Sequence, residues 1–119
     1  MITLIEATVI SYLSRALESD NVYAERPVNL PDEYYIVEKT GGDEENHINT
    51  ALIAIQCVSS VSLLNAAMMC HLVETAMKSF ISESNVSKCK LNSSYNFTDT
   101  ASKQYRYQAV YDITYMEGE

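Results

Sequence analysis

The chain has 119 residues, of which 47% are hydrophobic and 20% are charged, so we expect one folded domain (1–119) and not a disordered chain. Its 16 acidic and 8 basic residues give a net charge of −8, which opposes tight binding to nucleic acid phosphates or to an anionic membrane. No apolar run approaches the ~20 residues of a membrane helix, so a soluble protein with no membrane partner is expected.

The N-terminal sequence and the cysteines indicate a reducing compartment. Residues 1–6 contain no basic leader and carry a glutamate where a signal peptide would be apolar. The three cysteines, Cys57, Cys70 and Cys89, form no C-x-x-C pair, and their odd number argues for free thiols. We therefore expect the protein to be made and kept in the cytoplasm.

The first expected element is a helix. Thr3 and Glu6 fit a capping box at its start. Apolar residues then recur at the spacing of one buried stripe, namely Ile5, Val9, Tyr12, Leu13, Ala16 and Leu17. A short strand is expected over residues 22–25, and Pro27 and Pro31 then bracket a segment that can be neither a helix nor a central strand.

Two longer strands are expected next, separated by a loop. Residues 34–40 are rich in strand formers, and the glycine pair after them should end the strand. The polar run over 41–49 predicts a solvated loop of roughly eight residues, long enough to contact a partner. The candidate partner-docking loop consists of Gly41, Gly42, Asp43, Glu44, Glu45, Asn46 and His47. Residues 50–58 are apolar on both faces, which is typical of a central strand covered twice, by helices or by another subunit.

A second helix should follow, capped by Ser60 or Ser62 and extending toward residue 81. Its buried stripe is predicted to contain Leu63, Ala66, Met69, Cys70, Val73, Met77 and Phe80. Leu64, Met68 and Leu72 lie off that stripe and add more apolar surface than one helix face on one sheet needs. They either widen the core contact or form a subunit interface.

Two alternating segments close the chain. Over residues 87–99 the alternation places Cys89, Leu91, Tyr95 and Phe97 on one face. Over residues 103–116 it places Tyr105, Tyr107, Ala109, Tyr111, Ile113 and Tyr115 on one face. A period of two over such lengths predicts a long antiparallel hairpin. The expected fold is therefore α+β, an antiparallel or mixed sheet with two helices packed on it and a long C-terminal hairpin.

No group of side chains predicts catalysis, a metal or a cofactor. Neither His47 nor His71 has a second histidine one helical turn away. The acidic run at 43–45 lacks the alternating carboxylates of a calcium loop, and the glycine pair before it lacks the lysine of a phosphate-binding loop. We expect a protein that is not an enzyme and that needs no cofactor.

Four stretches of the chain carry a family resemblance: Ile36-Val-Glu-Lys-Thr-Gly-Gly42, Asn46-His-Ile-Asn-Thr-Ala51, Ala54-Ile-Gln56 and Arg106-Tyr-Gln-Ala-Val-Tyr-Asp-Ile-Thr-Tyr115. With the order of the elements, they resemble the small tail terminator proteins of long-tailed phages, also called tail-completion or tail-to-head joining proteins. The resemblance covers nearly the full length and implies an α+β subunit of a hexameric ring. Such a ring caps the tail tube, ends its elongation and docks the head-completion protein, while DNA passes through without specific binding. It implies a place in the tail or neck of a virion assembled in the host cytoplasm.

Two alternative hypotheses stay open. A head-completion or adaptor protein of the phage neck would belong to the same structural class. A small ligand-binding regulatory domain of the ACT or ferredoxin-like type would also combine alternating strands with two helices, although no polar residues converge in the sequence to form its pocket.

Overall fold

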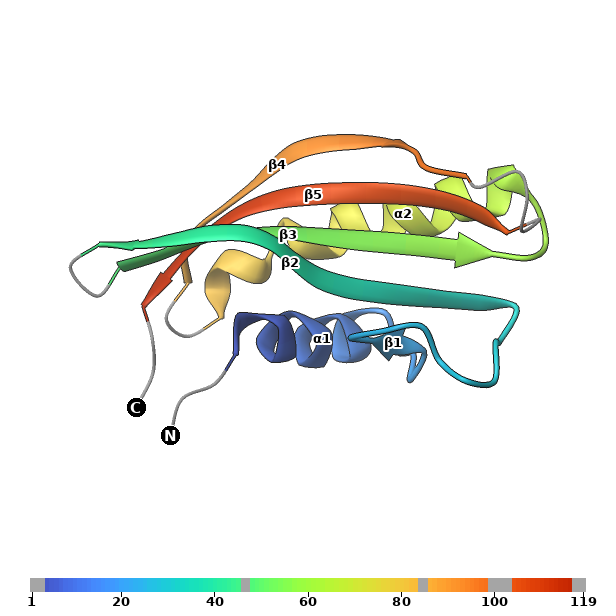
Figure 1. The fold of residues 1–119 in the computed structure, drawn as a ribbon, viewed down its shortest axis with the longest axis horizontal. Helices are drawn as coiled ribbons and strands as arrows, with labels where there is room; N and C mark the ends of the chain where they lie inside the picture. Colours follow the sequence, from blue (N-terminus) through green and yellow to red (C-terminus); the bar gives the residue numbers. More distant parts are fainter. Residues whose placement is uncertain (1–3, 46–47, 84–85, 99–103, 117–119) are drawn as a thin grey trace.

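The computed structural model describes residues 4–45, 48–83, 86–98 and 104–116. These residues form a five-stranded sheet with two helices packed against it, which confirms the predicted α+β class (Figure 1). The elements in chain order are α1 (Ile5–Ala16), β1 (Val22–Tyr23), β2 (Glu33–Glu45), β3 (Ile48–Ser59), α2 (Leu63–Met77), the 3-10 turn η1 (Phe80–Ser82), β4 (Val86–Asn96) and β5 (Tyr105–Met116).

The strand order is β1-β2-β3-β5-β4, with β1 parallel to β2 and every other pair antiparallel. β3 is central, as its apolar character on both faces predicted, and it pairs with β5 without interruption from Ile48↔Met116 to Ser59↔Tyr105. β4 and β5 form the predicted antiparallel hairpin. The two helices share one hydrophobic core with one face of this sheet.

α1 is anchored by the apolar stripe that its sequence predicted. Ile5, Val9 and Leu13, four residues apart, are buried in the core. Ala16, expected on the same stripe, is exposed because it is the last helical residue. Leu4 occupies the N-cap position and makes no side-chain cap, so the capping box expected at Thr3 is not the start of the helix; Thr3 itself lies outside the described residues.

α2 begins with a side-chain cap. The Ser62 hydroxyl accepts a hydrogen bond from the Asn65 backbone N–H at 3.0 Å, which confirms Ser62 as the cap. The buried face holds Ala66, Met69, Cys70, Val73 and Met77, with Phe80 buried in the following η1 turn. Leu63 was predicted on this face but is 38% exposed, because it is the first helical residue and lies just past the end of β3.

The glycine pair does not end β2. The strand continues through Gly41 and Gly42 to Glu45 and stays paired with β3, so the loop expected over 41–49 is wrong. A β-bulge between Lys39 and Gly41 shifts the register and lets the strand continue. At Gly42 a Cβ atom would lie 2.7 Å from the Thr50 carbonyl oxygen, so this strand position requires glycine. Of the expected docking loop, Asn46 and His47 lie outside the described residues.

A second bulge reverses the faces of β4. Leu91 pairs with Tyr111 on the helix-covered face, but the register shifts between Leu91 and Ser93, and Tyr95 then pairs with Gln108 on the opposite face. Phe97 lies beside Tyr95, with ring centroids 6.0 Å apart. The prediction that Cys89, Leu91, Tyr95 and Phe97 share one face is therefore wrong for the two aromatic residues.

Candidate functional site

The most prominent surface feature is a line of apolar side chains on α2. Leu64, Met68 and Leu72 are 78%, 56% and 48% exposed, and their spacing of four places them along one side of the helix. We call these three residues the α2 ridge. Their exposure argues against the wide core contact that the sequence left open, and the subunit interface stays a prediction.

The N-terminal end of the ridge is held firmly to the sheet. The Asn65 amide donates hydrogen bonds to the Glu33 carboxylate and, at 2.8 Å, to the Ser59 hydroxyl. Next to this contact, Val61, Ser62, Leu64, Asn65 and Met68 line a shallow hollow of about 240 Å³. Because these hydrogen bonds join α2 to β2 and β3, they fix the position of the first two turns of α2, which carry Leu64 and Met68.

The paired ends of β2 and β3 form an acidic arm that projects past both helices (Figure 1). Asp43 and Glu44 are exposed on this arm, and the Glu44 backbone N–H donates to the Asp43 carboxylate at 2.8 Å. The residues predicted as a docking loop therefore extend a strand for most of their length. A regular hairpin arm holds its charges in a defined position, which a mobile loop would not do.

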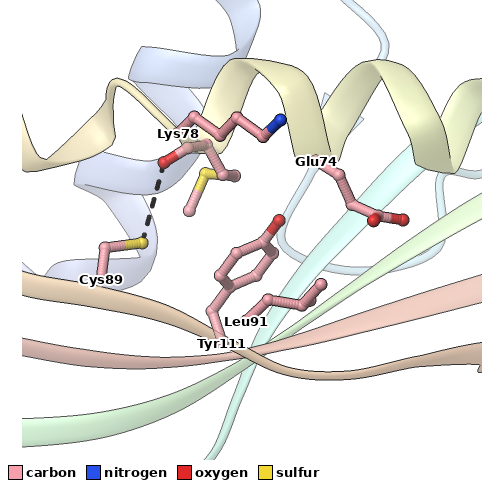
Figure 2. Close-up of a pocket in the computed structure, with 6 residues that line it drawn as sticks. Glu74, Lys78, Cys89, Leu91 and Tyr111 are labelled. Carbon is pink, nitrogen blue, oxygen red and sulfur yellow. Dashed lines mark hydrogen bonds between the residues drawn. The ribbon is translucent and has the colours of Figure 1, made fainter.

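A small pocket lies between α2 and the β4–β5 hairpin (Figure 2). Its volume is about 130 Å³, and its lining residues are Glu74, Met77, Lys78, Cys89, Leu91 and Tyr111. Figure 2 shows the Tyr111 hydroxyl directed from the sheet toward α2, with Lys78 above it and Glu74 to its right. Burial, followed by the charge of Glu74, raises the pKa of Tyr111, and burial raises the pKa of Cys89 to about 11. Neither group is ionised near neutral pH, so neither is an activated nucleophile.

A second polar cluster lies next to this pocket, within the core. The Cys70 thiol lies 3.4 Å from both the Glu74 carboxylate and the Ser94 hydroxyl. A hydrogen bond from Cys57 lowers the pKa of Cys70, whereas burial raises the pKa of Cys57 well above its usual value. Cys57 and Cys70 are 0% and 1% exposed, so no substrate can reach them. The i, i+4 spacing of Cys70 and Glu74 was the only sign of this cluster in the sequence.

The described residues contain no arrangement that points to a metal or a membrane. Within ranges 4–45, 48–83, 86–98 and 104–116, no three His, Cys, Asp or Glu side chains come together to hold a metal ion. His71 lies exposed on α2. None of the described helices is long and apolar enough to cross a membrane. What remains is a set of surfaces: the α2 ridge, the acidic arm and the edges of the sheet.

Comparison with solved structures shows a fold that this chain shares with a known protein. No family model matches the chain, and no curated protein matches it. A solved structure described as the virion of a native gene transfer agent (GTA) particle contains a chain that superposes with a TM-score of 0.69. The two chains are 18% identical, and the match covers 96% of this chain and 95% of that chain. At this identity the likeness shows a shared fold over nearly the whole length of both.

Proposed function

We propose that this chain is a structural assembly protein of a tailed phage or a related particle. Within that class we assign it as the tail terminator, a ring that caps the tail tube, ends its elongation and joins the tail to the head. The observation that carries the proposal is the shared fold, over 96% of this chain, with a chain of a gene transfer agent virion. The order of elements and the stretches over 36–42, 46–51, 54–56 and 106–115, which resemble tail terminators, point to the same role.

The α2 ridge supports self-association. Burial of exposed apolar side chains stabilises a contact by about 25 cal/mol for each Å² removed from water. Single large residues at the centre of a contact contribute most of its stability. In a ring, each copy uses two different surfaces, and the contact closes by rotation. The ridge is well suited to one of these surfaces, and a hexamer is the ring size that the resemblance implies.

The net charge of the chain supports a ring through which DNA passes without being bound. With a net charge of −8, a ring of such subunits repels phosphates and keeps a duplex from adhering to the lumen. The end of the β2–β3 hairpin would contact a partner at one rim of the ring, where the head-completion protein docks. The tail tube protein would then bind the other rim.

The direct test is to mix the purified protein with purified tail tubes and examine both by negative-stain electron microscopy. We expect rings of six subunits, either in the protein alone or at one end of each tube, and tubes that no longer elongate when tube protein is added. Binding to the head connector with no binding to tubes would favour the neck adaptor instead. A protein that stays monomeric and leaves tubes uncapped would contradict the proposal.

The structure offers little to the alternative of a ligand-binding regulatory domain. The pocket between α2 and the β4–β5 hairpin holds about 130 Å³, whereas sites for small molecules usually hold roughly 300–1,000 Å³. Stabilisation of the protein by an amino acid or a nucleotide in a thermal unfolding assay would revive that hypothesis.

A further inference from the structure

Two residues of opposite charge lie at the two ends of one row of paired residues that crosses the sheet. Asp43 pairs with Thr50, Thr50 with Thr114, and Thr114 with Lys88, across β2, β3, β5 and β4. Residues paired in register project to the same face, so Asp43 and Lys88 lie on one face, at opposite edges. Lys90, two residues further along β4, projects to that face as well.

Both edges have backbone groups without a strand partner among the described residues. β4 pairs with β5 on one side only. On the other edge, β1 pairs with β2 only at Tyr35 and Ile36, and α1 runs alongside the middle of β2, so the acidic arm is the part of this edge that projects past both (Figure 1). Exposed edge strands with long runs of unpaired N–H and C=O groups pair readily with another chain.

The strand directions allow these two edges to meet. β2 is antiparallel to β3, β3 to β5 and β5 to β4, so β2 and β4 run in opposite directions. A second copy placed beside the first in the same orientation therefore brings its β2 antiparallel to the first copy's β4. In that arrangement Lys88 and Lys90 of one copy approach Asp43 of the next.

The charges at these edges are available for such a contact. Lys88, Lys90, Asp43 and Glu44 are exposed. Among the described residues, Arg15 and Glu83 form an ion pair, and none of these four residues joins one. Lysines on an edge strand discourage indiscriminate pairing. A partner edge with carboxylates at the matching positions pairs with these lysines favourably, and the complementary charge makes the contact specific.

We propose that the lysine-bearing edge of β4 docks on the β2 edge of the acidic arm of a second copy of this chain. The contact is head-to-tail, with different surfaces on the two copies, and such contacts close into rings when the rotation between copies permits. This inference rests on the proposed function only for closure into a ring; the pairing of the two edges is a property of the chain itself. It assigns the side-by-side contact to the sheet, in addition to any contact of the α2 ridge.

Charge reversal at the two edges tests the inference. The variants K88E/K90E and D43K each place like charges at every contact, so each alone should associate roughly tenfold or more weakly than the wild type. In an equimolar mixture every contact between unlike copies is again attractive, so rings should return with the two variants alternating. Native mass spectrometry of the mixture, with one variant labelled with ¹⁵N, reads the composition directly. The variant R26E changes the net charge by the same amount as the single variant K88E, at an exposed position outside both edges, and it should assemble normally.

A second measurement uses the unaltered protein. A carbodiimide joins amines directly to carboxylates. In a mixture of ¹⁴N and ¹⁵N chains it should link Lys88 or Lys90 of one copy to Asp43 of another, and mixed-label peptides identify links between copies. Rings that form equally well from each variant alone, or a mixture that fails to restore them, would overturn the edge contact and leave the tail terminator proposal intact. If the wild type assembles only on tail tubes, the same variants are compared by tube capping. A wild type that neither associates nor caps tubes overturns both.

Discussion

Leu72 and Val73 are consecutive residues of α2 whose side chains meet opposite environments. Leu72 is 48% exposed on the α2 ridge, whereas Val73 is 0% exposed in the core between the helix and the sheet. The same charge introduced at the two positions therefore separates assembly from folding.

We expect Leu72→Glu to leave the monomer folded and to prevent ring formation. An exposed substitution changes the free energy of unfolding by about 0.5 kcal/mol or less, but a carboxylate in an apolar contact between subunits loses its hydration without a partner. Urea denaturation measures the first effect, and sedimentation velocity measures the second.

Val73→Glu is the matched comparison. It buries an unpaired carboxylate and should lower the free energy of unfolding by about 4 kcal/mol. Ser11→Glu, at an exposed position of α1, should affect neither folding nor assembly. An L72E protein that unfolds as readily as V73E would mean that Leu72 belongs to the core, and an L72E protein that forms normal rings would remove the ridge from the interface.

The end of the β2–β3 hairpin can be tested for docking of the head. Deletion of residues 43–46 would remove positions that pair with β3, such as Asp43 with Thr50, and would disturb the sheet. The double substitution N46A/H47A alters the connection between the strands and spares the paired residues. We expect normal rings and capped tubes but joining to heads reduced by roughly tenfold, the equivalent of about 1.4 kcal/mol of binding. Infectious particles formed at the wild-type rate in a complementation assay would refute the docking role.

The contact between α1 and the η1 turn should contribute strongly to the stability of the subunit. Phe80 is 0% exposed and meets Tyr12 edge to face, with ring centroids 5.2 Å apart. Phe80→Ala should lower the free energy of unfolding by about 3–5 kcal/mol. Tyr12→Phe keeps the ring and removes only the hydrogen bond to the Ala76 carbonyl, so about 1 kcal/mol is expected. Equal losses in the two variants, measured by urea denaturation, would contradict this division.

Much of the fold could be predicted from periodicity alone. The alternation in β5 and the i, i+4 stripe of α1 each specify one buried face, and the structure buries Ile113 and Val9 accordingly. The capping serine of α2 followed from local chemistry, because a hydroxyl at that position satisfies a free backbone N–H. These features depend on residues close together in the sequence.

The errors came from places where a distant strand decides the local structure. Gly41 and Gly42 resemble a strand end, but the pairing with Leu52 and Ala51 carries β2 through them. In β4, the bulge after Leu91 inverts the alternation, and no residue there marks it. The alignment of Asp43 with Lys88 was also hidden, because it depends on the pairing of four strands. The predicted interface residues were recognisable as surplus apolar side chains, but only the packing shows that they are exposed.

The buried phenols and thiols predict how stability changes in alkali. Burial raises the pKa of Tyr35 to about 12, whereas a tyrosine in the unfolded chain titrates near 10. Between these values the unfolded chain releases a proton that the folded chain keeps, so the free energy of unfolding falls as the pH rises. Below pH 10 this contribution is fully present.

We therefore expect the urea concentration at the midpoint of unfolding to stay constant near neutral pH. It should fall steadily above pH 9, where the unfolded chain begins to lose thiol protons. Cys89, with a pKa of about 11 against an unfolded value of 9.0, acts between pH 9 and 11, and Tyr35 acts between pH 10 and 12. Each group adds a slope of at most about 1.4 kcal/mol per pH unit. Cys89→Ala should reduce the loss of stability between pH 9 and 11, and Tyr35→Phe should reduce it between pH 10 and 12. Neither substitution should change the slope at pH values where its group is protonated in both the folded and the unfolded chain. If Tyr35→Phe left the slope between pH 10 and 12 unchanged, the Tyr35 hydroxyl would have to be hydrated in the folded protein, and the core beneath β2 would be more open than its packing indicates.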